Sequence, residues 1–210
     1  QVISTGYVCG GAEQSVRMLK QGLEQAGHQV CVVASDLCAN DPTTFSDYTY
    51  EHTRPGIRGY YRRFWNPAAY RLVKRVVREF KPDIVHFHTM GELSPSAIVA
   101  VGRTKAVLTI HGPEEYTKTL LPWFLERNAY RSTVVSRKNL NLFGMLEYVF
   151  YRYVQRPLYV RAFRRHLSVL ISPSKYMLEG IKSEHFRVDS LHILNGFELT
   201  DIEPLPNIHT

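Results

Sequence analysis

Short apolar runs rich in β-branched residues alternate with helical patterns along this chain, and this alternation constrains the fold more than any other feature. The runs are apolar almost throughout, which is typical of strands that are covered on both faces. Strand, helix and strand in repeated succession predict an α/β fold, a doubly wound parallel sheet of the Rossmann-like type with right-handed crossovers. The predicted strands are Val2–Ile3, Val30–Ala34, Ile84–Phe87, Ala106–Ile110, Ser168–Ile171 and Leu191–Leu194.

Helix boundaries are marked in three places between these runs. Apolar residues from 12 to 26 step by three and four, and Gly27 follows them as a C-terminal cap would. Asn66 and Pro67 predict a capped helix start with proline in the first turn, and Lys81-Pro82 predicts its end. Ser172 before Pro173 predicts the capped start of a third helix that runs towards residue 184.

Two stretches do not follow the alternation. Residues 36–65 lack a clear period, so we expect a long excursion there. Residues 139–166 predict a long aromatic helix that Pro157 kinks or restarts. We predict one Rossmann-like domain over residues 1–198 and the start of an interdomain linker over residues 199–210, with a second domain missing from this chain.

The 210 residues carry a net charge of +7, and 44% of them are hydrophobic. Disordered chains have fewer apolar residues, and no run here approaches the roughly 20 apolar residues of a membrane span. The charge is uneven, because residues 54–81 and residues 127–166 each sum to +8, which leaves the rest of the chain at −9. Three cysteines without metal-ligand spacing predict reduced thiols in a cytosolic protein.

Ligands of open parallel sheets lie outside the carboxyl ends of the strands, so the residues that follow each run are the site candidates. Gly10 and Gly11 lead from the first strand into a helix, where backbone N–H groups can approach a phosphate. The alternative is a tight turn without a ligand, and the spacing does not match the dinucleotide fingerprint. Asp36 after the second strand is a weak candidate for a ribose-binding acid.

Histidines follow two other runs. His86 and His88 alternate along one strand and therefore share a face, and His111 follows the next strand beside Gly112. His111 can donate a hydrogen bond to a hydroxyl or phosphate oxygen. A zinc or iron site built from the three histidines is the less favoured alternative, because no nearby acid or cysteine completes the ligand set.

Five motifs in this order and spacing resemble the N-terminal domain of family 4 glycosyltransferases, the retaining enzymes with the two-domain GT-B architecture. The resemblance covers nearly the whole chain. The motifs are Gly10-Gly11-Ala12-Glu13, the run from Lys81 to His88, the run from Leu108 to Gly112, Ile171-Ser172-Pro173-Ser174 and Ile193-Leu194-Asn195-Gly196.

The resemblance implies a hexosyltransferase-type enzyme that moves a sugar from a nucleotide-sugar donor to a glycan or lipid-linked acceptor with retention. The resemblance also implies that the enzyme needs no obligatory cofactor and no metal. His111 is the implied catalytic residue, and an isolated half-site is expected to be inactive. The implied substrate or donor-phosphate residues are Gly10, Gly11, Glu13, His88 and Gly112.

Residues 54–81 and 127–166, the two basic segments, have three interpretations. Two are nearly balanced, a plain solvated surface and a contact with an anionic membrane at its inner, cytoplasmic face, and the third is contact with another charged partner. A nucleic-acid partner is not expected. Two other functions remain as alternatives, a metal-dependent hydrolase using the three histidines and a non-catalytic binding module. The arginines of the predicted basic surface are Arg62, Arg63, Arg71, Arg75, Arg161, Arg164 and Arg165.

Overall fold

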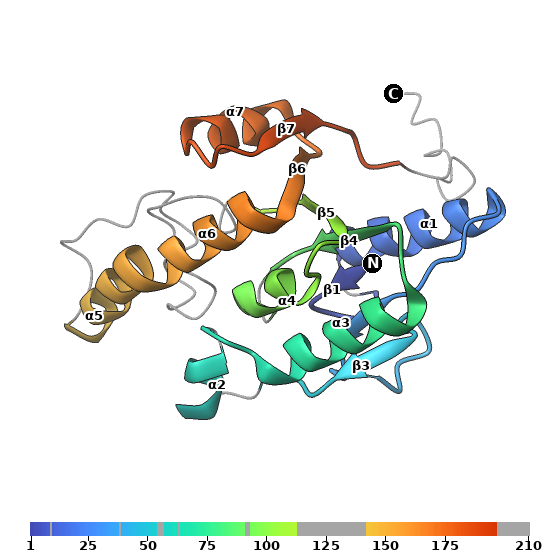
Figure 1. Ribbon diagram of the computed structural model, residues 1–210, viewed down its shortest axis with the longest axis horizontal. Coiled ribbons are helices and arrows are strands. Elements are labelled where there is room, and N and C mark those ends of the chain that lie inside the picture. Colours follow the sequence, from blue (N-terminus) through green and yellow to red (C-terminus); the bar gives the residue numbers. More distant parts are fainter. Residues whose placement is uncertain are drawn as a thin grey trace, which may run out of the picture.

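The computed structural model is a seven-stranded, all-parallel sheet with helices packed on it, which confirms the predicted α/β class (Figure 1). It describes residues 1–8, 10–37, 39–53, 57–62, 64–90, 93–112 and 142–196. The strands are β1 (Val2–Ile3), β2 (Val33–Ser35), β3 (Tyr48–Tyr50), β4 (Ile84–His88), β5 (Lys105–Thr109), β6 (Leu167–Ser172) and β7 (Asp189–His192). The helices are α1 (Gly11–Gln25), α2 (Ile57–Arg62), α3 (Pro67–Phe80), α4 (Ser94–Ala100), α5 (Leu142–Phe150), the π-helical turn η4 (Tyr151–Gln155), α6 (Arg156–His166) and α7 (Lys175–Ser183).

The strand order is β3-β2-β1-β4-β5-β6-β7, so the sheet is doubly wound and its order reverses between β1 and β4. Ligands of such sheets bind outside the carboxyl ends of the strands at this reversal. The register pairs Ile3 with His88, and His88 with Thr109. The segments that follow β1, β4 and β5 therefore start side by side at one edge of the sheet.

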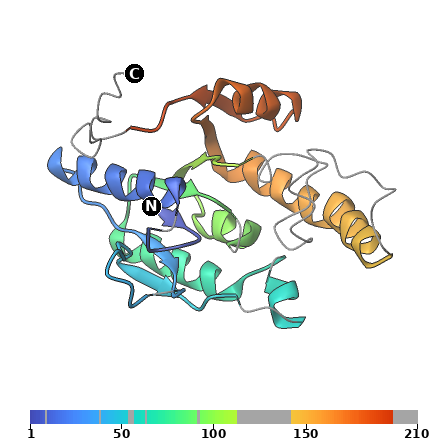
Figure 2. The ribbon, with the colours of Figure 1, turned by 180° about the vertical axis from the view of Figure 1, so that it is seen from behind.

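Helices α3, α4 and α6 lie side by side on one face of the sheet, and α1 covers the other (Figure 1 and Figure 2). The larger hydrophobic cluster includes Val85 and Phe87 of β4 and belongs to the α3, α4 and α6 face. The smaller cluster contains Ile3 of β1 and Val16 of α1. Because side chains alternate along a strand, His86 and His88 point away from the larger cluster, to the same face as Ile3.

The predicted strands agree with β1, β4, β5 and β6 to within one residue at each end. In the structure, β2 starts three residues later than expected, and β7 ends two residues earlier than expected. It also contains β3, α2 and α4, which we did not predict. Strand β3 lies in the expected excursion and has only three residues, of which Tyr48 and Thr49 are exposed, so its apolar pattern is too short to recognise.

The predicted helix ends are confirmed for α1 and α3. Asn66 caps α3, its Oδ1 accepting from the N–H groups of Ala68 and Ala69 at 3.1 Å each. Lys81 ends α3 in the left-handed region with a φ of 50°, and Gly27 follows α1 with a φ of 85°. Left-handed residues at these positions are the usual way to end a helix.

The predicted capping residue of the third helix is wrong. Ser174, not Ser172, caps α7, and its Oγ accepts from the N–H of Met177 at 3.5 Å. Ser172 is the last residue of β6, where it is fully buried and its Oγ donates to the Ser174 carbonyl at 2.7 Å. The strand continues one residue further than its apolar run and so displaces the helix start.

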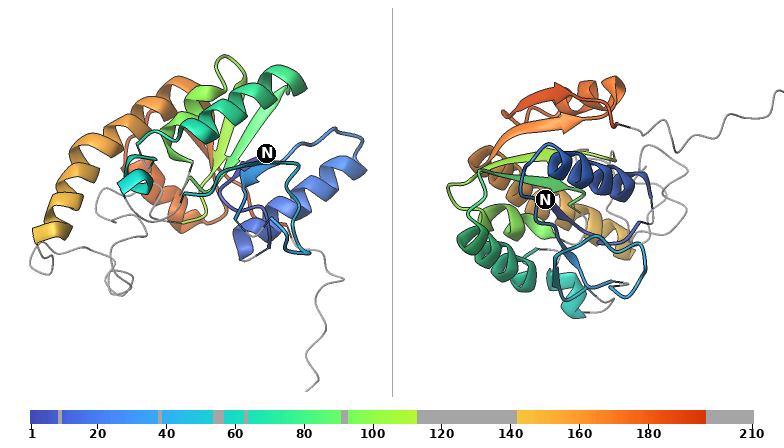
Figure 3. Two further views of the ribbon diagram at one scale, coloured as in Figure 1. Left: turned by 90° about the horizontal axis from the view of Figure 1, so that it is seen from below. Right: turned by 90° about the vertical axis from the view of Figure 1, so that its right-hand side faces the viewer.

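The long aromatic helix is confirmed from residue 142 onward, and residues 139–141 lie outside the described part of the chain. The expected interruption is the π-helical turn η4, which ends immediately before α6, whose first turn contains Pro157. Proline removes one helical N–H, and π-helical turns occur mostly as short interruptions inside α-helices. In the left view of Figure 3, α5 lies at the far left end of the molecule.

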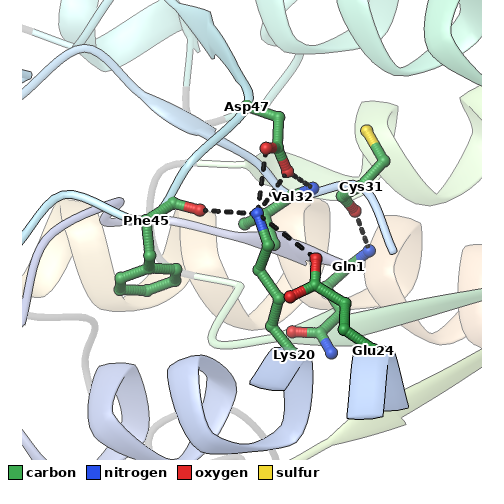
Figure 4. Close-up of polar contacts among 7 residues, drawn as sticks. All are labelled: Gln1, Lys20, Glu24, Cys31, Val32, Phe45 and Asp47. Carbon is green, nitrogen blue, oxygen red and sulfur yellow. Dashed lines mark hydrogen bonds and ion pairs between the residues drawn. The ribbon is translucent and has the colours of Figure 1, made fainter. Parts of the chain in front are cut away.

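A cluster around Lys20 fixes the excursion to α1 (Figure 4). The Lys20 ammonium donates to both carboxylate oxygens of Asp47 at 2.9 Å and to the Phe45 carbonyl at 3.4 Å. The Asp47 carboxylate also accepts from the N–H of Val32 at 2.7 Å. The Asp47 carboxylate thus joins α1, the segment directly before β2 and the segment directly before β3.

Gly6 allows the loop after β1 to pack closely against this segment. A Cβ on Gly6 would lie 2.7 Å from Ser46 Oγ and 2.9 Å from Ala34 Cβ. We expect Gly6→Ala to lower the free energy of unfolding by about 1–3 kcal/mol, since overpacking shifts backbone and neighbours. Gly22→Ala in α1 is the control, because a Cβ there meets nothing within 4 Å and should stabilise the helix by about 0.5–1 kcal/mol. Equal effects in urea denaturation would contradict the assigned crowding.

Candidate functional site

Two hydroxyl side chains join the ends of β1 and β4 by hydrogen bonds, at the edge of the sheet where the strand order reverses. Ser4, directly after β1, donates through Oγ to the carbonyl of Thr89 at 3.0 Å. Thr89, directly after β4, donates through Oγ1 to Ser4 Oγ at 3.3 Å. Thr89 has a φ of 47°, a conformation that costs free energy in a non-glycine residue and that tends to occur at functional sites.

Next to this edge the structure brings three histidines together. The rings of His86 and His88 are stacked, with centroids 3.9 Å apart, and His88 Nδ1 lies 3.3 Å from His111 Nε2. Thr109 completes the row, because its Oγ1 is 2.7 Å from His86 Nε2. The sequence predicted that His86 and His88 share a face and that His111 lies at the neighbouring strand end, and both are confirmed.

Burial keeps these imidazoles neutral near pH 7. It is the largest cause that lowers the pKa of His86 and that of His111, each to about 4. The pKa of His88 is lowered further, by burial first and then by repulsion from His86 and His111. A neutral histidine can donate one hydrogen bond and accept another, whereas an imidazolium can only donate.

This cluster should make the protein sensitive to acid. In the unfolded state these histidines take up protons near pH 6.5, whereas folded His86 and His111 take them up only near pH 4. Between these values the unfolded state binds more protons than the folded state. The free energy of unfolding is therefore highest above pH 6.5 and falls as the pH is lowered towards 4. We expect His86 alone to account for a loss on the order of 3 kcal/mol.

Urea denaturation at several pH values measures this loss. His86→Phe keeps a ring in the stack and removes one titrating group, so its stability should decline less steeply between pH 6.5 and 4. An unchanged slope in this variant, or constant stability of the parent protein over that range, would contradict the assignment.

The glycine loop lies where the sequence placed it, but it has an acid beside it. Gly10 is the extended residue before α1, and Gly11 opens the helix with no atom within 4 Å of a hypothetical Cβ. Glu13 in the first turn is buried, and its Oε2 lies 3.1 Å from the position of a Cβ on Gly10. A carboxylate at a helix start is stabilised by the helix dipole, so a bound phosphate here has to share this end with Glu13.

The other candidate residues are distributed as follows. Gly112 follows His111 and is buried, and the chain after it, up to residue 141, lies outside the described part. The Asp36 carboxylate accepts from the N–H of His52 at 2.7 Å, so it ties β2 to the segment after β3. Thr109 and the Ser4–Thr89 pair were missed, because only the register of neighbouring strands brings them to the site.

The three histidines do not converge on a common point. The rings of His86 and His88 lie against each other at an interplanar angle of 32°, and His86 bonds to Thr109. Within the residues that the structure describes, no group of three His, Cys, Asp or Glu side chains is arranged to hold a metal ion. Of the cysteines, Cys31 is a buried free thiol, and Cys9 and Cys38 lie outside the described ranges.

The side chains of the predicted basic surface differ in their exposure and in their partners. Arg71 and Arg75 on α3, and Arg161 and Arg165 on α6, are exposed, and Arg71 also donates through Nε to the Pro67 carbonyl at 3.1 Å. The guanidinium of Arg62 pairs with Glu51 at 2.6 Å. Arg63 lies outside the described residues.

Two further arginines of α6 hold the chain together. Arg164 donates to the carbonyls of Phe186 and His185 at 2.9 and 3.2 Å. Arg156, which we did not single out, forms a buried ion pair with Glu184 at 2.6 Å. These contacts fasten α6 to the segment between α7 and β7.

Along the described chain no helix is long and apolar enough to cross a membrane. Among the side chains of the α5–η4–α6 run that the structure describes, six large apolar ones are nevertheless exposed, at fractions from 43% to 79%. They are Leu142, Leu146, Val149, Tyr153, Val154 and Leu158.

Comparisons with known proteins now identify the family. The alpha-monoglucosyldiacylglycerol synthase of Acholeplasma laidlawii is 33% identical to this chain over an alignment of 129 residues, and the match covers 55% of this chain and 30% of that protein. The match thus spans less than a third of the curated relative. Among solved structures, the crystal structure of Acinetobacter baumannii MurG aligns with 94% of this chain and 66% of its own, at 13% identity and a TM-score of 0.38. The sequence profile of Glycosyltransferase Family 4 matches residues 9–199, and the chain therefore belongs to this family of glycosyltransferases.

Proposed function

We propose that this chain is the acceptor-side half of a retaining, GT-B glycosyltransferase that moves a hexose from a nucleotide-sugar to a glycan or lipid-linked acceptor. The family membership supports the reaction class. The name of the Acholeplasma laidlawii relative, a glucosyldiacylglycerol synthase, supports a hexose donor and a lipid acceptor. The observation that carries the proposal is the neutral His111 beside the strand-order reversal, where sheets of this kind bind ligands.

Each part of the site has a physical role in this reaction. The neutral imidazole of His111 suits a sugar hydroxyl, because it can form hydrogen bonds without adding charge. The start of α1 at Gly10 and Gly11 offers backbone N–H groups to a diphosphate, with Glu13, His88 and Gly112 around the bound substrate. Amides and cations can stabilise a diphosphate leaving group, so we propose that no metal is obligatory.

Catalysis requires the donor and the acceptor to be held together, so the activity belongs to the enzyme with both domains. The test is a screen of nucleotide-hexoses with the full-length protein, followed by determination of the anomeric configuration of the product. Transfer that preserves the configuration of the donor is expected. Inverted configuration would contradict the retaining mechanism, and the absence of transfer from every nucleotide-sugar would contradict the proposed function.

We also propose that the enzyme binds the anionic inner face of the membrane through the α5–η4–α6 run. Leu142, Leu146, Val149 and Tyr153 follow one another at steps of four, three and four residues, which places them on one helical face. Exposed apolar side chains with nearby arginines favour the interface of an anionic bilayer. Arg161 and Arg165, further along the same run, supply exposed cations.

Sedimentation with phosphatidylcholine vesicles, with and without phosphatidylglycerol, tests this surface. Binding that requires the anionic lipid and weakens with salt is expected. Replacing Arg161 and Arg165 with glutamine should reduce it, whereas the control Arg78→Gln at the end of α3 should not. Absence of binding at low salt would contradict the membrane proposal.

A further inference from the structure

The two ring nitrogens of His88 differ in their surroundings. Nδ1 lies 3.3 Å from His111 Nε2, whereas Nε2 is buried and has no hydrogen-bond partner among the residues that the structure describes. The side chain is 3% exposed and is stacked on His86. The unpaired nitrogen restricts the arrangement of protons in the whole pair, because each neutral imidazole carries one N–H.

Only two arrangements of the two protons place a hydrogen bond between the rings. In the first, His88 Nδ1–H donates to His111 Nε2, which leaves His88 Nε2 as a buried acceptor without a donor. In the second, His111 Nε2–H donates to His88 Nδ1, which leaves a buried N–H of His88 without an acceptor. Orphaned buried N–H groups are the rarer of the two defects, so the first arrangement is favoured.

We propose that His88 is a positioning residue that donates through Nδ1 to His111 and thereby fixes the His111 tautomer with its proton on Nδ1. The partner of one ring nitrogen sets the protonation of the other. The stack with His86, itself bonded to Thr109, holds the donating ring in place.

The tautomer decides what His111 offers to a substrate. Nε2 pairs with His88, and Nδ1 carries the N–H, so a substrate oxygen that reaches Nδ1 meets a donor and not a proton acceptor. The lowered pKa of His111 agrees with a neutral ring near pH 7. This consequence rests on the proposed function, but the tautomer itself does not.

Long-range ¹H–¹⁵N NMR of ¹⁵N-histidine-labelled protein tests the tautomer without any variant. At neutral pH we expect His111 to have a protonated Nδ1 and an unprotonated Nε2, and His88 to have the same pattern. A protonated Nε2 in His111 would overturn the proposal.

Two substitutions separate positioning from packing. His88→Asn retains an amide donor near the place of Nδ1 and should preserve the His111 tautomer. His88→Leu removes the donor, so His111 should populate the form with its proton on Nε2. His86→Phe keeps a ring in the stack and leaves the His88–His111 contact intact, so the tautomer should not change. A His111 spectrum that is unaffected by His88→Leu would also overturn the proposal.

Kinetics supply a second measurement. In the complete enzyme His88→Leu should lower kcat by about tenfold or more with a smaller change in KM, and His88→Asn should restore part of the loss. Equal losses in both variants would indicate a merely structural role. Because the NMR experiment needs no substrate, its outcome stands whether or not sugar transfer is found.

Discussion

Replacing His111 with alanine in the complete enzyme is expected to lower kcat by about 10²- to 10³-fold, the usual cost of losing one preorganised hydrogen-bond donor. His111 follows β5 at the carboxyl edge of the sheet, next to the point where the strand order reverses. Its ring is oriented by His88, so a donor is in place before the substrate binds. Alanine removes this donor and leaves the backbone unchanged.

Steady-state kinetics with the identified donor measure this effect, and circular dichroism checks that the variant folds. His28→Ala is the matched control, because His28 is an exposed residue after α1 and should retain parental kcat. His111→Gln provides a second comparison, since its amide can still pair with His88. Near-normal turnover of His111→Ala would contradict a role of His111 in the reaction.

The largest expected effect on stability comes from the ion pair between Arg156 and Glu184. Their charged atoms are 2.6 Å apart, and the two side chains are only 8% and 14% exposed. The Arg156 guanidinium also lies 5.2 Å from the ring centroid of Phe186. Removing either side chain breaks this buried ion pair and leaves the other charge with one partner fewer, so we expect Arg156→Met or Glu184→Gln to cost about 3–5 kcal/mol.

The double variant should cost less than the sum of the single ones, because either single variant already breaks the ion pair. Chemical denaturation of all four proteins gives the coupling energy directly. The pair Arg78–Glu79 is the control, since its side chains are 77% and 53% exposed and such pairs contribute about 0–1 kcal/mol. Additive effects at Arg156 and Glu184 would contradict the coupling.

The parts of the fold that local chemistry specifies were predictable from the sequence. Asn66 with Pro67 and Gly27 mark helix ends through backbone requirements that hold in any context, and the apolar runs mark the central strands. Strand β3 and helix α4 were missed because their residues depend on neighbours distant in sequence. Ser172 was misassigned as a cap because β6 extends beyond its apolar run.

The candidate site divides in the same way. The shared face of His86 and His88 follows from strand geometry, and the position of His111 follows from its place after a strand. The bonds of His86 to Thr109 and of His88 to His111 each span 23 residues and depend on the register of β4 against β5. Arg164 and Arg165 are both exposed, and charge counting could not show that Arg164 donates to two carbonyls.

The close packing of the loop after β1 has a consequence for how such sequences can vary. The N–H of Val8 donates to Thr43 Oγ1, and the N–H of Phe45 donates to the carbonyl of Gly6, so this loop and the excursion form one unit. Lys20 and Asp47 anchor the same unit to α1. An insertion or deletion between residues 36 and 47 would therefore displace the glycine loop, even though the two segments are far apart in the sequence. Length changes in this excursion should be accompanied by compensating changes in the loop and in α1.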